Sequence, residues 1–155
     1  MRKKAILILL IAWVVTVAIG IFLFSSQTGE ESGEISKGLM ENVFAFLQLD
    51  AEREERLHHL IRKAAHMTEY AVLSASVCVL FFYLADIRHW KNVSRRKMAV
   101  YSLAFSVIFA VTDEIHQAFV PGRGPAVKDV LLDAVGAALG IAVIYAFYRY
   151  KRRGK

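Results

Sequence analysis

An uninterrupted apolar run near the N-terminus limits the kinds of structure that this chain can form. Residues 5–24 are twenty consecutive uncharged residues, and they follow Arg2, Lys3 and Lys4. A helix of this length rises about 30 Å, which matches the hydrocarbon core of a bilayer. The run is longer than the apolar region of a signal peptide, and no A-x-A cleavage motif follows it. We therefore interpret it as a retained membrane-spanning helix.

Three further apolar segments follow, which predicts an all-α integral membrane protein built as a four-helix bundle. They cover about residues 64–84, 98–120 and 126–148. Hydrophobic residues make up 56% of the 155-residue chain, more than is usual for a soluble domain of this size. By length, the chain is expected to form a single membrane domain over residues 1–155.

The outer loop of residues 25–63 is polar and carries a helical pattern of its own. A T-x-x-E capping box begins at Thr28 and is followed by apolar residues at helical spacing. We therefore expect an extracytoplasmic amphipathic helix between the first two spanning helices. Asp50 is expected to cap a further helix that begins at Ala51 and continues without a break into residues 64–84. The apolar positions of the amphipathic pattern are Ile35, Leu39, Val43, Phe46 and Leu47.

Basic residues are unevenly distributed between the two sides of this arrangement. The N-terminus, the loop of residues 86–97 and the C-terminal tail carry thirteen of the 20 Lys and Arg residues. The positive-inside rule then places both termini in the cytoplasm of a multi-pass protein of the cell membrane. These residues flank apolar runs, so the net charge of +6 does not indicate a nucleic-acid partner.

Ionisable residues recur inside three of the apolar segments, where they are costly and commonly mark a functional site. Counted by helical rise from the cytoplasmic ends, Glu69, Asp113 and Asp133 all reach a depth of about 24–26 Å. Three helices thus bring carboxylates to one level in the outer half of the membrane. A tight turn at residues 121–125 makes the last two helices an antiparallel hairpin and places Arg123 near the same level.

The polar cluster predicts acid–base chemistry. Carboxylates crowded in a medium of low dielectric constant share protons, which suits general acid–base catalysis or a proton relay. The cluster supplies the candidate catalytic residues, which are His66, Glu69, Asp113, Glu114, His116 and Asp133. A divalent metal is an alternative ligand, but there is no H-E-x-x-H or similar spacing, so no metal ligands are assigned.

Three blocks of the chain resemble the VanZ-like family of small bacterial membrane proteins. They are FSSQ (24–27), RKAAHMTEYAVL (62–73) and TDEIHQAFVPGRGPAVKDVLLDAVGAALG (112–140). The family is named for a component associated with resistance to the glycopeptide antibiotic teicoplanin. The resemblance therefore implies a cell-envelope protein that acts at the outer face of the membrane.

Motif matching also extends the set of candidate site residues. Besides the candidate catalytic residues, the signature polar positions of the family fall on the candidate ligand-binding residues Ser26, Gln27, Arg62, Lys63, Tyr70, Gln117, Arg123 and Asp129. The expected partners are membrane lipids, in particular an anionic lipid or a lipid-linked cell-wall precursor. Arg62, Lys63 and Arg123 would hold its anionic group.

Two other functions fit the same pattern. Intramembrane carboxylates also occur in ion- or proton-coupled transporters, and the chain is a candidate subunit of one. A buried polar network can also be purely structural and hold an adaptor protein together. Catalysis, the oligomeric state and a link to resistance in this family member stay open at this point.

Overall fold

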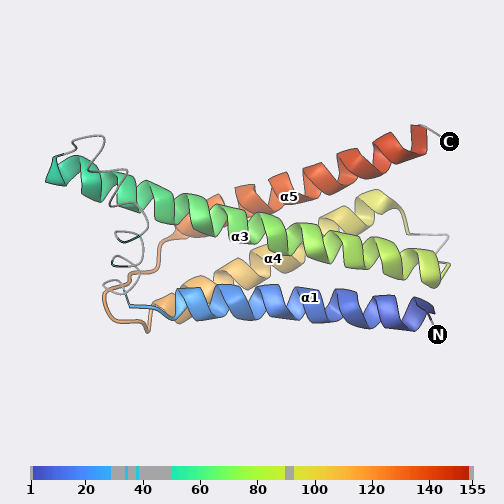
Figure 1. Cartoon of the computed structure of the whole chain (residues 1–155), viewed down its shortest axis with the longest axis horizontal. Helices are drawn as coiled ribbons and strands as arrows, with labels where there is room; N and C mark the ends of the chain where they lie inside the picture. Colours follow the sequence, from blue (N-terminus) through green and yellow to red (C-terminus); the bar gives the residue numbers. More distant parts are fainter. Residues whose placement is uncertain (1, 29–33, 35–37, 39–49, 90–92, 154–155) are drawn as a thin grey trace.

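The computed structural model describes residues 2–28, 34, 38, 50–89 and 93–153. It contains four long helices in the order α1 (Arg2–Ser25), α3 (Ala51–Ile87), α4 (Arg95–Gln117) and α5 (Val127–Arg153). Each of the four is long and apolar enough to cross a membrane (Figure 1). The predicted all-α, multi-pass four-helix bundle is thereby confirmed. The apolar positions of the predicted amphipathic helix, between residues 35 and 47, lie outside the described residues.

Both termini lie at the same end of the bundle (Figure 1). We call this end, which also holds the close of α3 and the start of α4, the termini end. The opposite end holds the close of α1 and the connection between α4 and α5, and we call it the turn end. Helix α3 contacts all three other helices, and its interface with α5 is the most extensive. The bundle is therefore organised around α3.

The start of α3 agrees with its predicted cap. The Asp50 carboxylate accepts the backbone N–H of Arg53 at 2.9 Å, and the helix runs unbroken through residues 64–84. Its 37 residues correspond to a length of about 55 Å, well above the thickness of a hydrocarbon core. The first turns of α3 extend past the end of α1 at this side of the bundle, as Figure 1 shows.

The predicted limits of the last two helices need correction. Helix α4 begins at Arg95 rather than at residue 98, because the Ser94 hydroxyl caps it by accepting the N–H of Lys97. It ends at Gln117 rather than at residue 120, since the N–H groups of residues 119 and 120 turn to acceptors three residues back. Helix α5 continues to Arg153, where a basic tail is favourable at the negative end of the helix dipole.

Two glycines let α5 approach α3 closely. A Cβ atom at Gly136 would overlap the backbone carbonyl of Met67, and one at Gly140 would overlap that of Ala71. One turn after Ala71 on α3, the Ser74 hydroxyl donates to the carbonyl of Ala137, the residue after Gly136, at 2.7 Å. This is the close packing that a G-x-x-x-G spacing allows between membrane helices. It carries the polar residues of α5 against those of α3.

Candidate functional site

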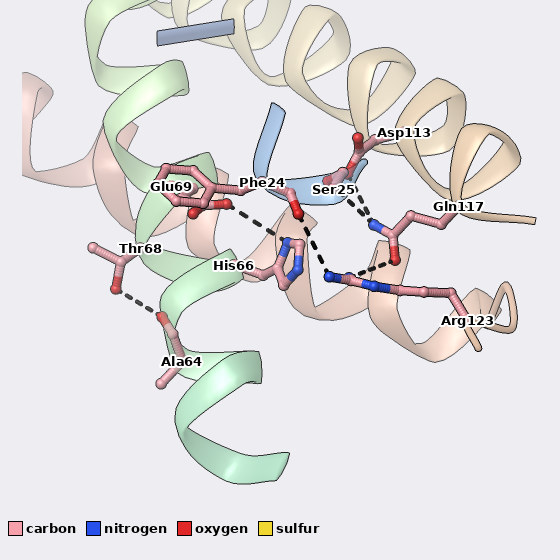
Figure 2. Close-up of polar contacts among 9 residues, drawn as sticks. All are labelled: Phe24, Ser25, Ala64, His66, Thr68, Glu69, Asp113, Gln117 and Arg123. Atoms are coloured by element: carbon pink, nitrogen blue, oxygen red, sulfur yellow. Dashed lines mark hydrogen bonds and ion pairs between the residues drawn. The ribbon is translucent and has the colours of Figure 1, made fainter. Parts of the chain in front are cut away.

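A buried serine links the end of α1 to α4. The Ser25 hydroxyl donates to Asp113 Oδ2 at 2.7 Å, and Gln117 Nε2 lies 3.3 Å from the same hydroxyl and 3.1 Å from the same carboxylate oxygen (Figure 2). Ser25 is fully buried, and Asp113 and Gln117 are nearly so. Ser25 is not among the residues predicted for the site. Its only sequence signal is its place in the FSSQ block, which also contains the predicted residues Ser26 and Gln27.

Arg123 continues this network from the α4–α5 connection. Its Nη1 donates to Gln117 Oε1 at 3.2 Å and its Nη2 to the carbonyl of Phe24 at 3.5 Å (Figure 2). Its Nε donates to the carbonyl of Gln27 at 3.1 Å. All three acceptors are neutral oxygens, so none of them cancels the positive charge. Burial and the neighbouring Arg62 lower the pKa of Arg123, and nearby carboxylates raise it. An arginine stays protonated in proteins, so the guanidinium remains a cation.

Ser26 and Gln27, which directly follow α1, lie beside this network. The Ser26 hydroxyl is 3.1 Å from His116 Nε2, and the imidazole stacks on the ring of Phe22 with 4.3 Å between centroids. His116 therefore faces the side of α1. Gln27 contributes a backbone carbonyl to Arg123. Ser26, Gln27 and His116 do not line the pocket described below.

Carboxyl groups from three helices meet beneath Arg123. Tyr70 is fully buried, and its hydroxyl interacts electrostatically with Asp113, Asp133 and Glu69. Asp133 in turn interacts with Asp113 and Glu69. The structure therefore brings together the groups of α3, α4 and α5 that helical rise places at one depth. Their catalytic role stays a prediction.

Several oxygens of this cluster are buried without a hydrogen bond to any described residue. They are Tyr70 Oη, Glu69 Oε2, Asp113 Oδ1 and Asp133 Oδ1. Glu69 Oε2 also lies 3.7 Å from His66 Nδ1 (Figure 2). Most buried polar atoms in proteins are hydrogen-bonded, and an unpaired one in a spanning helix is costly. Such a concentration at one place is typical of a functional site rather than of a packing interface.

Glu114 lies at the same end but has a different partner. Its Oε2 accepts the backbone N–H of Ala126 at 2.9 Å. Ala126 immediately precedes α5, and neither it nor Pro125 has a side chain that can cap that helix. The Glu114 carboxylate of α4 therefore fixes the chain that enters α5. Its geometry supports a positioning function, while the predicted catalytic function remains a prediction.

A pocket opens between α3, the α4–α5 connection and α5. Its volume is about 80 Å³. Two basic residues of α3, Arg62 and Lys63, line it together with Arg123. The remaining polar lining side chains are His66, Glu114, Gln117, Asp129 and Asp133. The pocket therefore combines a basic rim with carboxylates of α5.

The charges of the pocket are unequally paired. Lys63 Nζ lies 2.6 Å from Asp129 Oδ1 and forms an ion pair with it. Arg62 forms no hydrogen bond or ion pair with another described residue. Arg123 has only neutral acceptors among these residues. Two guanidinium groups thus line the pocket without direct contact to a carboxylate of the described residues.

The described residues provide no metal-binding geometry. Within them, no group of three or more His, Cys, Asp or Glu side chains is placed to hold a metal ion. The chemistry open to this arrangement is therefore anion binding by the guanidinium groups and proton exchange among the buried acids.

Comparison with known families identifies the chain. The family described as VanZ/LLP1 matches residues 6–148, which is nearly the whole chain. The chain therefore belongs to this family, as the resemblance of its sequence blocks implies. The name of the family links it to glycopeptide resistance. The comparisons with curated proteins and with solved structures gave no significant match.

Proposed function

We propose that this VanZ/LLP1-family membrane protein binds the phosphate-bearing headgroup of an anionic envelope lipid or lipid-linked precursor in the pocket at the turn end. The observation that carries the proposal is the pair of guanidinium groups, Arg62 and Arg123, that line the pocket without a carboxylate partner among the described residues. Two such forks match the oxygens of one phosphate group. Lys63 lies beside them but is already paired with Asp129.

The surroundings of the pocket favour a lipid over a soluble anion. Phe119, Val127 and Leu131 flank the α4–α5 connection, and their side chains are 82%, 79% and 62% exposed. Leu132 lines the pocket itself. In a membrane protein such residues face acyl chains. A headgroup in the pocket can therefore keep its chains in contact with the bilayer.

Orientation is part of the proposal. The termini end carries most of the Lys and Arg residues, and the positive-inside rule assigns that end to the cytoplasm. The turn end then opens to the outer face of the membrane. A cysteine introduced at the exposed Lys128, at the same end of the bundle, should react with a membrane-impermeant maleimide in intact cells. Reaction only after lysis would place the pocket inside and contradict this assignment.

The buried acids supply a second part of the proposed function. His66 lines the pocket and lies 3.7 Å from Glu69, while Asp133 links the pocket to Tyr70 and Asp113. These groups order the bound headgroup or exchange protons with it. The identity of the bound lipid decides whether the protein only binds the headgroup or also modifies it chemically.

The decisive variant is Arg62→Gln, because Arg62 has no partner among the described residues whose loss would disturb the fold. Binding of dioleoyl phosphatidylglycerol to the detergent-solubilised protein can be measured by native mass spectrometry. Loss of one charge-assisted contact should weaken binding about tenfold or more, while dioleoylglycerol, which lacks phosphate, should bind weakly to both proteins.

Lys128→Gln is the matched control. Lys128 is exposed, lies in the first turn of α5 and does not line the pocket. Its replacement removes one positive charge from the same end and should leave the affinity within about twofold. Equal loss in both variants would mean that only the general surface charge attracts the lipid. An unchanged affinity in Arg62→Gln would contradict the proposed site.

A further inference from the structure

The partners of the three carboxylates in the pocket limit which ligands the pocket can hold. Of its three acids, Asp129 is paired with Lys63, and Glu114 accepts the N–H of Ala126. Asp133 is 3% exposed, yet it forms no hydrogen bond with any described residue. Among the described residues, the pocket therefore combines two cations without a charged partner and one buried acid without a hydrogen-bond partner.

We propose that the bound headgroup carries a protonated primary amine next to its phosphate, with the phosphate at Arg62 and Arg123 and the amine at Asp133. This inference rests on the proposed function: the phosphate is the anionic group of that proposal, and the added amine makes the whole headgroup zwitterionic. An ammonium group donates three hydrogen bonds, and its contact with a carboxylate is both charge-assisted and favourable in a buried site. A phosphate alone would leave Asp133 as an unpaired acid close to an anion.

The dimensions of the pocket agree with a short amine arm. Its volume of about 80 Å³ has room for several water molecules. A two-carbon arm with its nitrogen has three non-hydrogen atoms and fits this space. An ethanolamine-type phosphate ester therefore meets both the charge pattern and the size of the pocket.

The position of Asp133 agrees with this order of groups. Asp133 lies six residues after the start of α5, which is about 9 Å deeper along the helix. Arg123 lies before α5 begins, and Arg62 lies one turn before His66 on α3. The phosphate is consequently held at the entrance and the amine points inward. The buried Tyr70 and Asp113 interact electrostatically with Asp133, although neither lines the pocket itself.

A headgroup series tests the inference on the unchanged protein. Dioleoyl phosphatidylethanolamine, phosphatidylcholine and phosphatidic acid are titrated separately by native mass spectrometry. The choline nitrogen has no N–H and phosphatidic acid has no amine. We expect phosphatidylethanolamine to bind at least tenfold more tightly than either of the other two lipids.

Asp133→Asn provides the complementary test. This variant keeps the shape of the side chain but removes the negative charge, so it should remove the preference for phosphatidylethanolamine and leave phosphatidic acid as tight or tighter. The control is Asp50→Asn, since asparagine also caps helices and Asp50 lies at the distant start of α3. The control should retain the full preference.

The outcomes separate the two proposals. If all three phospholipids bind equally and Asp133→Asn has no effect, the amine site is wrong and the phosphate site stands. If none of them binds more tightly than dioleoylglycerol, the proposed function itself fails. If Asp133→Asn weakens all phospholipids equally, Asp133 contributes to the phosphate site and the assignment of the amine is overturned.

Discussion

The two ends of the bundle each hold a half-buried arginine, and the two arginines have opposite surroundings. At the termini end, Arg95 forms an ion pair with Asp86 and donates to the carbonyl of Phe82 at 2.7 Å and the hydroxyl of Tyr148 at 3.1 Å. Its guanidinium also lies 4.9 and 4.8 Å from the centroids of the Phe82 and Tyr148 rings. At the turn end, Arg123 has three neutral acceptors and no carboxylate in ion-pair contact among the described residues.

This difference distinguishes a structural arginine from one that can bind a ligand. The charge of Arg95 is compensated by a carboxylate and two aromatic faces, so its interactions are complete within the chain. The charge of Arg123 is held in place by carbonyl oxygens and is not cancelled. The acids differ in the same way, since Asp86 is exposed and paired, whereas Asp133 is buried and has no hydrogen-bond partner in the described part of the chain.

Replacing Arg95 should give the largest change in stability. Arg95→Gln leaves Asp86 without its ion pair and removes the contacts with Phe82 and Tyr148. We expect the free energy of unfolding to fall by about 2–3 kcal/mol, mainly because the hydrogen bonds and cation–π contacts are lost, since the ion pair with the exposed Asp86 contributes little. Chemical denaturation in detergent measures it. The affinity for phosphatidylglycerol should stay unchanged, and a loss of affinity equal to that of Arg62→Gln would break the comparison.

Replacing Arg123 should give a smaller change in stability and a clear change in binding. Arg123→Gln removes hydrogen bonds to the carbonyls of Phe24 and Gln27, which costs about 1–2 kcal/mol. Because the charge at the pocket is also lost, phosphatidylglycerol should bind about tenfold more weakly. Arg123→Lys is the control, since it retains the charge and should recover part of the affinity. If Arg123→Gln affected stability alone, Arg123 would be a second structural arginine.

Replacing Asp129 should give the smallest change in stability, and it should raise the affinity for phosphatidylglycerol instead of lowering it. Asp129→Asn releases Lys63 from a partly exposed ion pair, which costs up to about 1 kcal/mol of stability. The released ammonium becomes available to a phosphate, so the affinity for phosphatidylglycerol should rise about threefold. The same titration measures it. A lower affinity would show that Asp129 itself contacts the ligand.

Periodicity and hydropathy predict the framework of this protein correctly. The four spanning helices, the cap at Asp50 and the meeting of α3, α4 and α5 at the turn end follow from helical rise and residue spacing. These properties depend on the backbone repeat and on burial, which leave a regular signal in the sequence. The amphipathic helix predicted between α1 and α3 lies mostly outside the described residues.

The pairing of polar groups could not be predicted in the same way. Ser25 and Ser26 are adjacent in the sequence, yet Ser25 is buried against Asp113 while Ser26 faces His116. Glu114 and Arg123 bind backbone groups, which no side-chain pattern reveals. The rotation of about 100° per residue determines on which face of a helix a side chain lies. Its hydrogen-bond partner depends on differences of tenths of an ångström in the distances between helices. Sequence spacing therefore locates the site without assigning each contact.

The central claim is that Arg62 and Arg123 hold a lipid phosphate at the turn end. The most direct test is a structure of the protein determined in nanodiscs that contain phosphatidylethanolamine and phosphatidylglycerol. The account predicts phosphate density within hydrogen-bonding distance of both guanidinium groups, with acyl chains along Phe119 and Leu131. Ordered lipid phosphate found elsewhere on the bundle, with neither Arg62 nor Arg123 in contact with it, would contradict the account.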